Sequence, residues 1–234
     1  MGGMGTGAAA FGVVVRIDIW SDIACPWCFI GLTRLEAALA RFEHADAVEV
    51  ELHSFQLDPG LPDSYPGTEA EYLAAAKGLD PASVSQMVGR VAGIAAADGL
   101  SLDFDALKVA NSRRAHRLIQ HAKQADPGGD TAWRMEMALF AAHFSDGLDT
   151  GDPDTLVGIA TSVGLDAGAA REALTSEELD ALVGADVDEA SRLGIRGVPF
   201  FVLAGRYGLS GAQQPEVFDQ ALRQVWDEAV PAAG

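Results

Sequence analysis

Apolar and polar residues alternate at both ends of the chain in the way that β-strands require. Residues 13–20 begin with three valines, after which Arg16 and Asp18 alternate with Ile17 and Ile19, which is typical of a strand buried at its start. Residues 48–55 alternate between apolar and polar side chains and predict a second strand. Two more strands are predicted near the other end of the chain, at residues 200–203 and 207–209.

A helical period of apolar residues lies between the first two strands. Over residues 25–42 apolar side chains recur at steps of three and four, which predicts an amphipathic helix. Pro26 suits its first turn, because an N–H at that position has no partner within the helix. Strand, helix and strand in this order form a βαβ unit, whose strands run parallel with a right-handed crossover. A last helix is predicted at residues 214–228.

The middle of the chain has helical period and a high alanine content, without a fixed repeat. The predicted helices lie at residues 69–77, 82–98, 108–124, 131–145, 153–163, 167–174 and 176–193. The predicted fold class is therefore α/β, with one sheet built from both ends of the chain and a large all-helical insertion. We expect one domain from residues 13–67 and 176–229, a separate inserted domain at residues 68–175, and a flexible tail at residues 1–12.

Composition and net charge bear on the cellular compartment of the protein and on its binding partners. The 234 residues are 49% hydrophobic and 21% charged, as in an ordinary folded protein. Sixteen Lys and Arg stand against 34 Asp and Glu, and the net charge of −18 disfavours nucleic acid and anionic membranes as partners. No stretch approaches the ~20 apolar residues that span a bilayer. The first residues also lack the basic start of a secretory signal, so we expect a cytoplasmic protein, where structural disulfides are rare.

Both cysteines of the chain, Cys25 and Cys28, stand at the predicted start of the first helix. Three residues apart, they share one face of its first turn, within the roughly 4.4–6.8 Å Cα separation that a disulfide needs. The first sulfur also faces unpaired backbone N–H groups and the positive end of the helix dipole, which favour the thiolate. Cys25 is therefore predicted to be the nucleophile, and Cys28 the shielded thiol that resolves a mixed disulfide.

Two other interpretations of the cysteine pair stay open. A structural zinc site needs four ligands, but the chain has no third cysteine and its histidines lack the spacing of zinc ligands, so no metal site is predicted. A pair of inert core cysteines would leave Pro26 and the position between strand and helix unexplained. A C-x-x-C motif beside a βαβ unit favours redox chemistry.

Several short runs resemble the DsbA family, and in particular its cytoplasmic FrnE-like branch. The runs are Ser21-Asp22 before Cys25-Pro26-Trp27-Cys28, Asn111 with Ala115-His116-Arg117-Leu118, Leu139-Phe140, His143-Phe144, Gly197-Val198-Pro199-Phe200-Phe201-Val202 and Ser210-Gly211-Ala212-Gln213. The resemblance extends from about residue 13 to residue 226. It implies a thioredoxin-like fold with an inserted helical domain. It also implies dithiol–disulfide exchange through a redox-active Cys25–Cys28 disulfide, with no bound cofactor.

The same resemblance implies where a substrate binds. In the family the proline of the Val-Pro pair is cis and faces the active disulfide, so we expect a cis Val198–Pro199 bond, with an ordinary trans proline as the alternative. The Val198 backbone would then pair with an extended substrate. Pro26 and Trp27 are the other expected substrate contacts, although Trp27 could equally cover the sheet edge.

Three further residues have weaker assignments. Asn111 and His116 match a region that borders the ligand pocket in glutathione-dependent relatives, yet His116 fits a core or surface histidine equally well. Asp22 is expected to cap the first helix, and acceptance of a proton from Cys28 is the alternative.

The expected function is disulfide exchange with protein disulfide or dithiol substrates, or with small thiols. A small thiol such as glutathione or mycothiol is the expected co-substrate, and the chain is expected to be a monomer or a weak homodimer. One alternative is a glutathione- or mycothiol-dependent isomerase or transferase. The relatives of that kind, the 2-hydroxychromene-2-carboxylate isomerases and kappa-class glutathione transferases, carry serine where this chain has Cys25. The other alternative is a chaperone-like protein that binds unfolded peptides.

Overall fold

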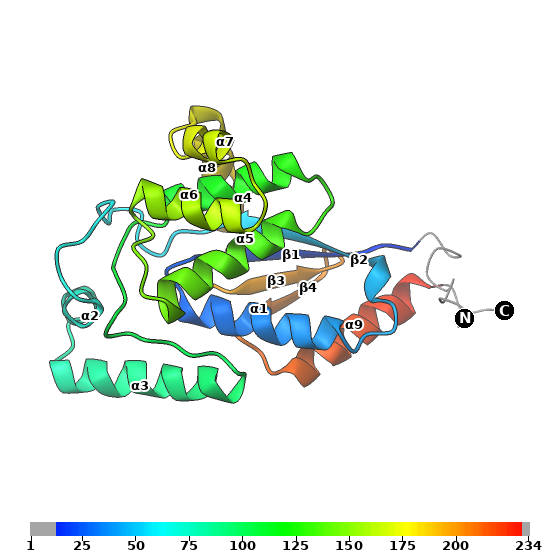
Figure 1. Cartoon of the computed structure of the whole chain (residues 1–234). Helices are drawn as coiled ribbons and strands as arrows, with labels where there is room; N and C mark the ends of the chain where they lie inside the picture. Colours follow the sequence, from blue (N-terminus) through cyan, green and yellow to red (C-terminus); the bar gives the residue numbers. More distant parts are fainter. Residues whose placement is uncertain (1–12, 231–234) are drawn as a thin grey trace, which may run out of the picture.

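The strands at the two ends of the chain form one mixed sheet in the computed structural model, which describes residues 13–230 (Figure 1). The order of the strands across the sheet is β2-β1-β3-β4. They comprise β1 (Val15–Ser21), β2 (Val48–Ser54), β3 (Phe200–Leu203) and β4 (Tyr207–Ser210). The β1–β2 pair is parallel, whereas β1–β3 and β3–β4 are antiparallel. The predicted fold class, a thioredoxin-like α/β fold with a helical insertion, is confirmed.

Helices cover both faces of this sheet. On one face α1 (Pro26–Leu39) packs against α9 (Pro215–Ala229), and both begin with proline at the position where a missing N–H costs nothing. On the other face α8 (Glu177–Arg192) contacts β2. The remaining helical segments are a 3-10 turn η2 (Ala45–Ala47), α2 (Glu69–Lys77), α3 (Pro81–Ala97), α4 (Arg113–Ala125), α5 (Thr131–Phe140), a π-helix η3 (Ala141–Ser145), α6 (Pro153–Ser162) and α7 (Ala167–Ala173).

The start of α4 differs from the prediction, which placed it at residue 108. The residues before Arg113 are instead extended along the loop that precedes α2. Backbone N–H of Tyr65 donates to the Val109 carbonyl at 3.0 Å, and N–H of Asn111 donates to the Pro62 carbonyl at 3.2 Å. These tertiary hydrogen bonds replace the helical ones that the apolar period alone would favour.

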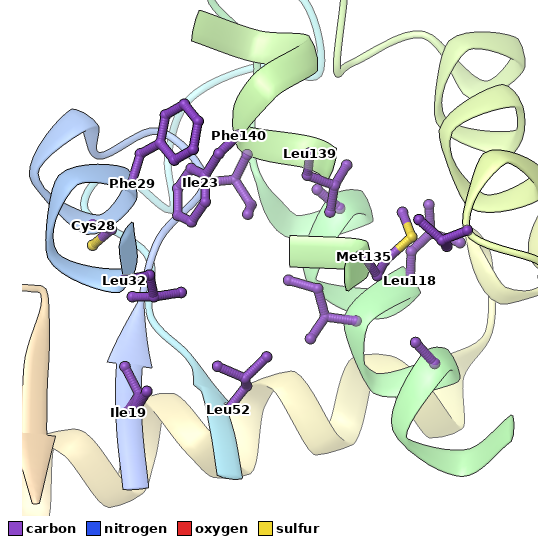
Figure 2. Close-up of a cluster of buried hydrophobic side chains, with 14 of the residues drawn as sticks. Ile19, Ile23, Cys28, Phe29, Leu32, Leu52, Leu118, Met135, Leu139 and Phe140 are labelled. Carbon is purple, nitrogen blue, oxygen red and sulfur yellow. The ribbon is translucent and has the colours of Figure 1, made fainter. Parts of the chain in front are cut away.

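The sheet and the inserted helices share one cluster of buried apolar side chains (Figure 2). Phe29 of α1 stacks on Phe140 of α5 with 5.3 Å between ring centroids. The side chains labelled in Figure 2 come from both parts of the chain: Ile19, Ile23, Cys28, Phe29, Leu32, Leu52, Leu118, Met135, Leu139 and Phe140. The residue limits of two domains stay a prediction, and the tail predicted at residues 1–12 lies outside the described residues.

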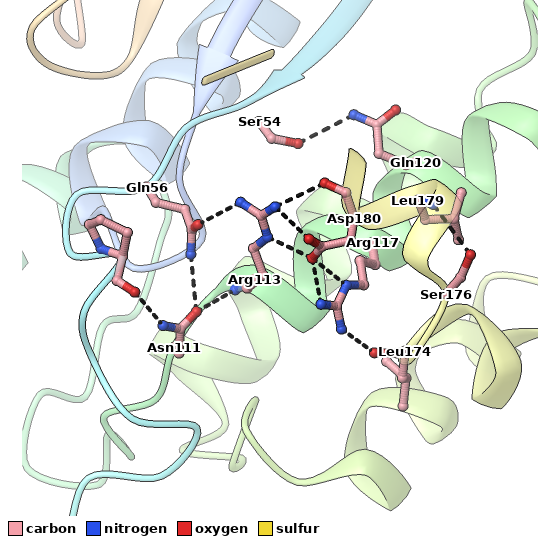
Figure 3. A network of polar contacts seen from close by, with 11 residues as sticks. Ser54, Gln56, Asn111, Arg113, Arg117, Gln120, Leu174, Ser176, Leu179 and Asp180 are labelled. Atoms are coloured by element: carbon pink, nitrogen blue, oxygen red, sulfur yellow. Dashed lines mark hydrogen bonds and ion pairs between the residues drawn. The ribbon is translucent and has the colours of Figure 1, made fainter. Parts of the chain in front are cut away.

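Two arginines of α4 bind one carboxylate of α8 (Figure 3). The Arg113 guanidinium donates to both carboxylate oxygens of Asp180, each at 2.8 Å, and Arg117 Nε donates to the same group at 2.9 Å. These bonds, Arg113 first, hold the pKa of Asp180 well below its usual range. The Asp180 carboxylate therefore fastens α8 to α4.

A histidine on β2 joins α8 to the sheet. His53 Nδ1 lies 3.0 Å from Asp186 of α8, and its Nε2 lies 2.9 Å from Asp18 of β1, while its ring stacks on Trp20. Both nitrogens can donate at once only in the imidazolium form. Burial lowers the pKa of His53 and nearby Lys123 acts the same way, but the two carboxylates outweigh both and raise it to about 9.

The raised pKa of His53 predicts a loss of stability in alkaline solution. The stabilisation is complete below the unfolded pKa of about 6.5 and is lost as the pH rises through about 9, by up to about 3 kcal/mol. The measurement is urea unfolding of the wild type and His53→Gln, at about pH 6 and about pH 10. We expect the difference in unfolding free energy between the two proteins to shrink at the higher pH. A difference that is equal at both pH values would contradict a charged His53.

Candidate active site at the start of helix α1

The chain turns tightly between β1 and α1, and this turn places the first cysteine at the helix end. Backbone N–H of Cys25 donates to the Asp22 carbonyl at 2.9 Å, and Cys25 is the N-cap of α1 with an extended backbone conformation. Pro26 follows as the first helical residue. The Cys25 side chain therefore lies at the end of the helix where backbone N–H groups are unpaired and the dipole is positive.

The two thiols differ in accessibility. Cys25 is 5% exposed, whereas Cys28, one turn further into α1, is fully buried. Burial raises the pKa of the Cys28 thiol well above its usual value, and the adjacent Cys25 thiol raises it further. Cys28 is therefore held as a protonated thiol behind Cys25.

The Val198–Pro199 segment faces the first thiol from the loop before β3. The peptide bond between these residues is cis, which confirms the prediction. The Cys25 thiol donates to the Val198 carbonyl at 3.6 Å. A Cβ atom at Gly31 would lie only 2.9 Å from Pro199 Cγ, so glycine at this position lets α1 approach the loop. The structure thus brings together Cys25, Cys28, Val198 and Pro199.

The residues beside Cys25 include two exposed apolar side chains. Trp27 is 37% exposed on the first turn of α1, and Leu57 is 51% exposed in the loop after β2. The backbone N–H of Leu57 bonds to Asp22, which places this loop next to the turn that carries Cys25. Pro26 and Val198 are half-buried.

Asp22 does not cap α1, so the capping prediction is wrong. The N-cap is Cys25, which stands three residues later because of the intervening turn. The Asp22 carboxylate instead accepts hydrogen bonds from the N–H groups of Ala24 at 3.3 Å and Leu57 at 2.7 Å, and contacts His116 Nε2 at 3.3 Å. Burial alone would raise the pKa of Asp22, but its hydrogen bonds, chiefly with His116, lower it below the usual value.

The side chains of Asn111 and His116 have different surroundings. The nitrogen of the Asn111 amide donates to the Pro59 and Leu61 carbonyls. Its oxygen accepts from Gln56 and from the Arg113 N–H (Figure 3). The side chain therefore holds the loop after β2 in place. His116 is buried against Asp22, and its Nδ1 has no hydrogen-bond partner.

Two residues with buried polar side chains were not among the predicted site residues. Ser21 ends β1, and Glu136 lies on α5, and both are 1% exposed. Glu136 does carry a signal in the sequence, since it stands four residues before Phe140 and so shares the apolar face of the helix. Ser21 carries only its place in the Ser21-Asp22 run before the cysteines, which does not indicate that its hydroxyl is buried.

Other features of the described chain lie outside this site. Within residues 13–230 no helix is long and apolar enough to cross a bilayer. The same residues contain no group of three His, Cys, Asp or Glu side chains placed to hold a metal ion. A cavity of about 600 Å³, lined by Arg16, Glu49 and Trp133 among others, lies where β1 and β2 begin, at the opposite end of these strands from Cys25.

Comparisons with known proteins agree with this arrangement. The DSBA-like thioredoxin domain family matches residues 16–223. The uncharacterized protein YwbO of Bacillus subtilis is 26% identical over 212 residues, which cover 90% of this chain and 96% of that protein. The crystal structure of a probable DsbA oxidoreductase from Streptomyces coelicolor shares 38% identity, with a TM-score of 0.85 and coverage of 94% of this chain and 93% of the other. The cytosolic disulfide reductase DsbM from Pseudomonas aeruginosa, solved with GSH, is 23% identical, with a TM-score of 0.61 and coverage of 91% and 99%.

Proposed function

The chain belongs to the DSBA-like thioredoxin domain family and is a thiol–disulfide oxidoreductase, and from this we propose that it exchanges disulfides through Cys25 and Cys28. The observation that carries the proposal is the asymmetry of the pair. Cys25 is the N-cap of α1 and reaches solvent, whereas Cys28 is fully buried behind it. A nucleophile needs access and thiolate character, and a resolving thiol needs only to reach the first sulfur.

The proposed reaction has two steps. The Cys25 thiolate attacks one sulfur of a substrate disulfide, a mixed disulfide forms, and the other substrate sulfur leaves as a thiolate. Cys28 then attacks the Cys25 sulfur, the bond between Cys25 and the substrate breaks, and the second substrate sulfur leaves. The substrate gains two electrons, and the enzyme keeps a Cys25–Cys28 disulfide. Run in reverse, the same steps oxidise a substrate dithiol.

We infer that protein disulfides or dithiols are substrates, with a small thiol of the glutathione or mycothiol kind able to restore the reduced enzyme. A substrate sulfur joined to Cys25 must lie beside Val198, because the Val198 carbonyl is 3.6 Å from Cys25 Sγ. The exposed Trp27 and Leu57 supply apolar contacts next to it. Val198, Pro199, Pro26 and Trp27 would thus receive an extended chain, while Asn111 would position the loop that carries Leu57. A cytoplasmic location and the lack of a bound cofactor stay predictions from the sequence.

Alkylation tests the assignment of the two thiols. With limiting iodoacetamide at neutral pH, the reduced protein is expected to carry label on Cys25 well before Cys28, because Cys28 is buried and its pKa is raised. Peptide mass spectrometry measures the order. In denaturant the two sites should react at similar rates, which provides the control. Equal labelling of the folded protein, or faster labelling of Cys28, would overturn the assignment.

A further inference from the structure

The segment that follows β4 lies between α1 and the loop that faces Cys25. Backbone N–H of Gly211 donates to the Pro199 carbonyl at 2.8 Å. The φ of Gly211 is +80°, a left-handed conformation that glycine adopts without strain. A Cβ atom at Gly31 of α1 would lie 2.9 Å from Pro199 Cγ and 3.5 Å from Ala212 Cα. The loop and the segment after β4 therefore approach α1 at the same point.

A buried arginine of α1 holds this segment. Arg34 is 5% exposed, and its Nη1 donates to the Ala212 carbonyl at 2.8 Å. Its Nε donates at 2.9 Å to the carboxylate of Asp98, the C-cap of α3. Arg34 stands nine residues after Cys25, which is about 14 Å along the helix axis. Any effect of Arg34 on the thiol must therefore pass through the segments that it binds.

The surroundings of Arg34 indicate that its bonds fix a position. Ala212 packs against a buried apolar cluster of Ile30, Val91 and Ala95. A charged group in such a place costs free energy unless it is paired and hydrogen-bonded, and an apolar side chain of similar volume would often be as stable. An apolar side chain could not bond the Ala212 carbonyl, however. The bonds of Arg34 therefore specify where the segment after β4 lies.

We propose that Arg34 is a positioning residue for substrate docking. It holds the segment after β4, whose Gly211 bonds the Pro199 carbonyl, and the adjacent Val198 carbonyl lies 3.6 Å from Cys25 Sγ. An extended substrate that pairs with the Val198 backbone must present its disulfide to the Cys25 sulfur, so this edge needs one fixed position. This inference rests on the proposed function.

Two disulfides of different size test the role of Arg34. The first is an extended peptide joined by a disulfide to a second copy, with fluorophores that quench each other until the two copies separate. The second is the aromatic disulfide dithiobis(nitrobenzoic acid), which has no peptide backbone to pair with Val198. Each is mixed with an excess of the reduced full chain in a stopped-flow instrument. The peptide series gives a half-saturating concentration and a maximal rate.

The variants separate the guanidinium from its charge and its volume. Arg34→Met keeps the apolar stem, and Arg34→Lys keeps the charge without the planar fork that bonds two partners. Arg41→Met is the matched control, because Arg41 lies just beyond α1 and forms an exposed ion pair with Asp219. Circular dichroism shows whether each protein is folded.

Arg34→Met is expected to raise the half-saturating concentration of the peptide disulfide by about tenfold, the size expected for one lost hydrogen bond. The maximal rate and the reaction with the small disulfide should stay within about twofold, because the surroundings of Cys25 at the helix start are unchanged. Arg34→Lys should fall between Arg34→Met and the wild type. Arg41→Met should match the wild type with both disulfides.

The possible failures are distinguishable. An unchanged half-saturating concentration in the Arg34→Met protein would overturn the positioning role of Arg34. An equal slowing with the peptide and with the small disulfide would overturn it too, because a general loosening of the fold acts on both. Arg34→Lys keeps the test decisive if the Arg34→Met protein does not fold. A wild type that reduces neither disulfide would refute the proposed function itself.

Discussion

Replacement of Cys28 by serine is expected to trap mixed disulfides on Cys25 and to lower insulin reduction by roughly 100-fold or more. The reason is the loss of an intramolecular thiol, whose effective concentration far exceeds that of any thiol in solution. Cys25 keeps its position at the start of α1 in this variant, so it can still attack. Adducts on Cys25 should be visible by mass spectrometry and should disappear with excess reductant.

A matched variant and the two alternative functions each give a different expected result. Cys25→Ser should neither reduce insulin nor form adducts, because the buried Cys28 cannot reach a substrate. If the chain were instead a glutathione-dependent isomerase, Cys28→Ser would be nearly silent, since such chemistry needs one activating group at position 25. A chaperone-like protein would hold unfolded insulin without reducing it in any variant. Full insulin reduction by the Cys28→Ser protein would defeat the two-cysteine mechanism.

Local signals explain which elements the sequence predicts well. The helix at residues 69–77 is predicted to the residue because Thr68 and Glu71 form a capping box and Gly78 ends the helix in the left-handed conformation. The strand at residues 200–203 is predicted equally well, as an apolar run that stops at a turn. The start of α4 is not predicted correctly, because hydrogen bonds to the distant Pro59–Tyr65 loop determine where this helix begins.

The same distinction between local and long-range signals applies to the residues of the candidate site. Cys25 and Cys28 can be identified from their spacing and from the strand and helix on either side of them. The hydrogen bonds of Asp22 cannot be identified from the sequence, because its partners Leu57 and His116 approach from other segments only after folding. The burial of Ser21 and Glu136 cannot be predicted from spacing either, since it depends on the segments that pack around them. Residue spacing along the chain identifies the two cysteines of one helix turn. The contacts that surround them come from other segments and are known only from the structure.

Phe140→Ala is expected to destabilise the whole protein by about 3–5 kcal/mol. Phe140 is fully buried on α5, and its ring stacks on Phe29 of α1 at 5.3 Å and on Phe144 at 6.4 Å between centroids. Alanine would leave a cavity between the inserted helices and the helix that carries the thiols. The measurement is equilibrium unfolding in urea, followed by circular dichroism and by tryptophan fluorescence.

The shape of that unfolding curve decides whether the insertion is an independent unit. Because the buried cluster runs without a break from the sheet into α4 and α5, we expect one transition that moves to lower urea for both probes. Trp20 lies in the sheet and Trp133 on α5, so fluorescence reports both parts. Phe140→Leu, which keeps most of the apolar volume, should cost about 1 kcal/mol in the same transition. Two separate transitions in the Phe140→Ala protein, with the helical one first, would show instead that residues 68–175 fold apart from the sheet.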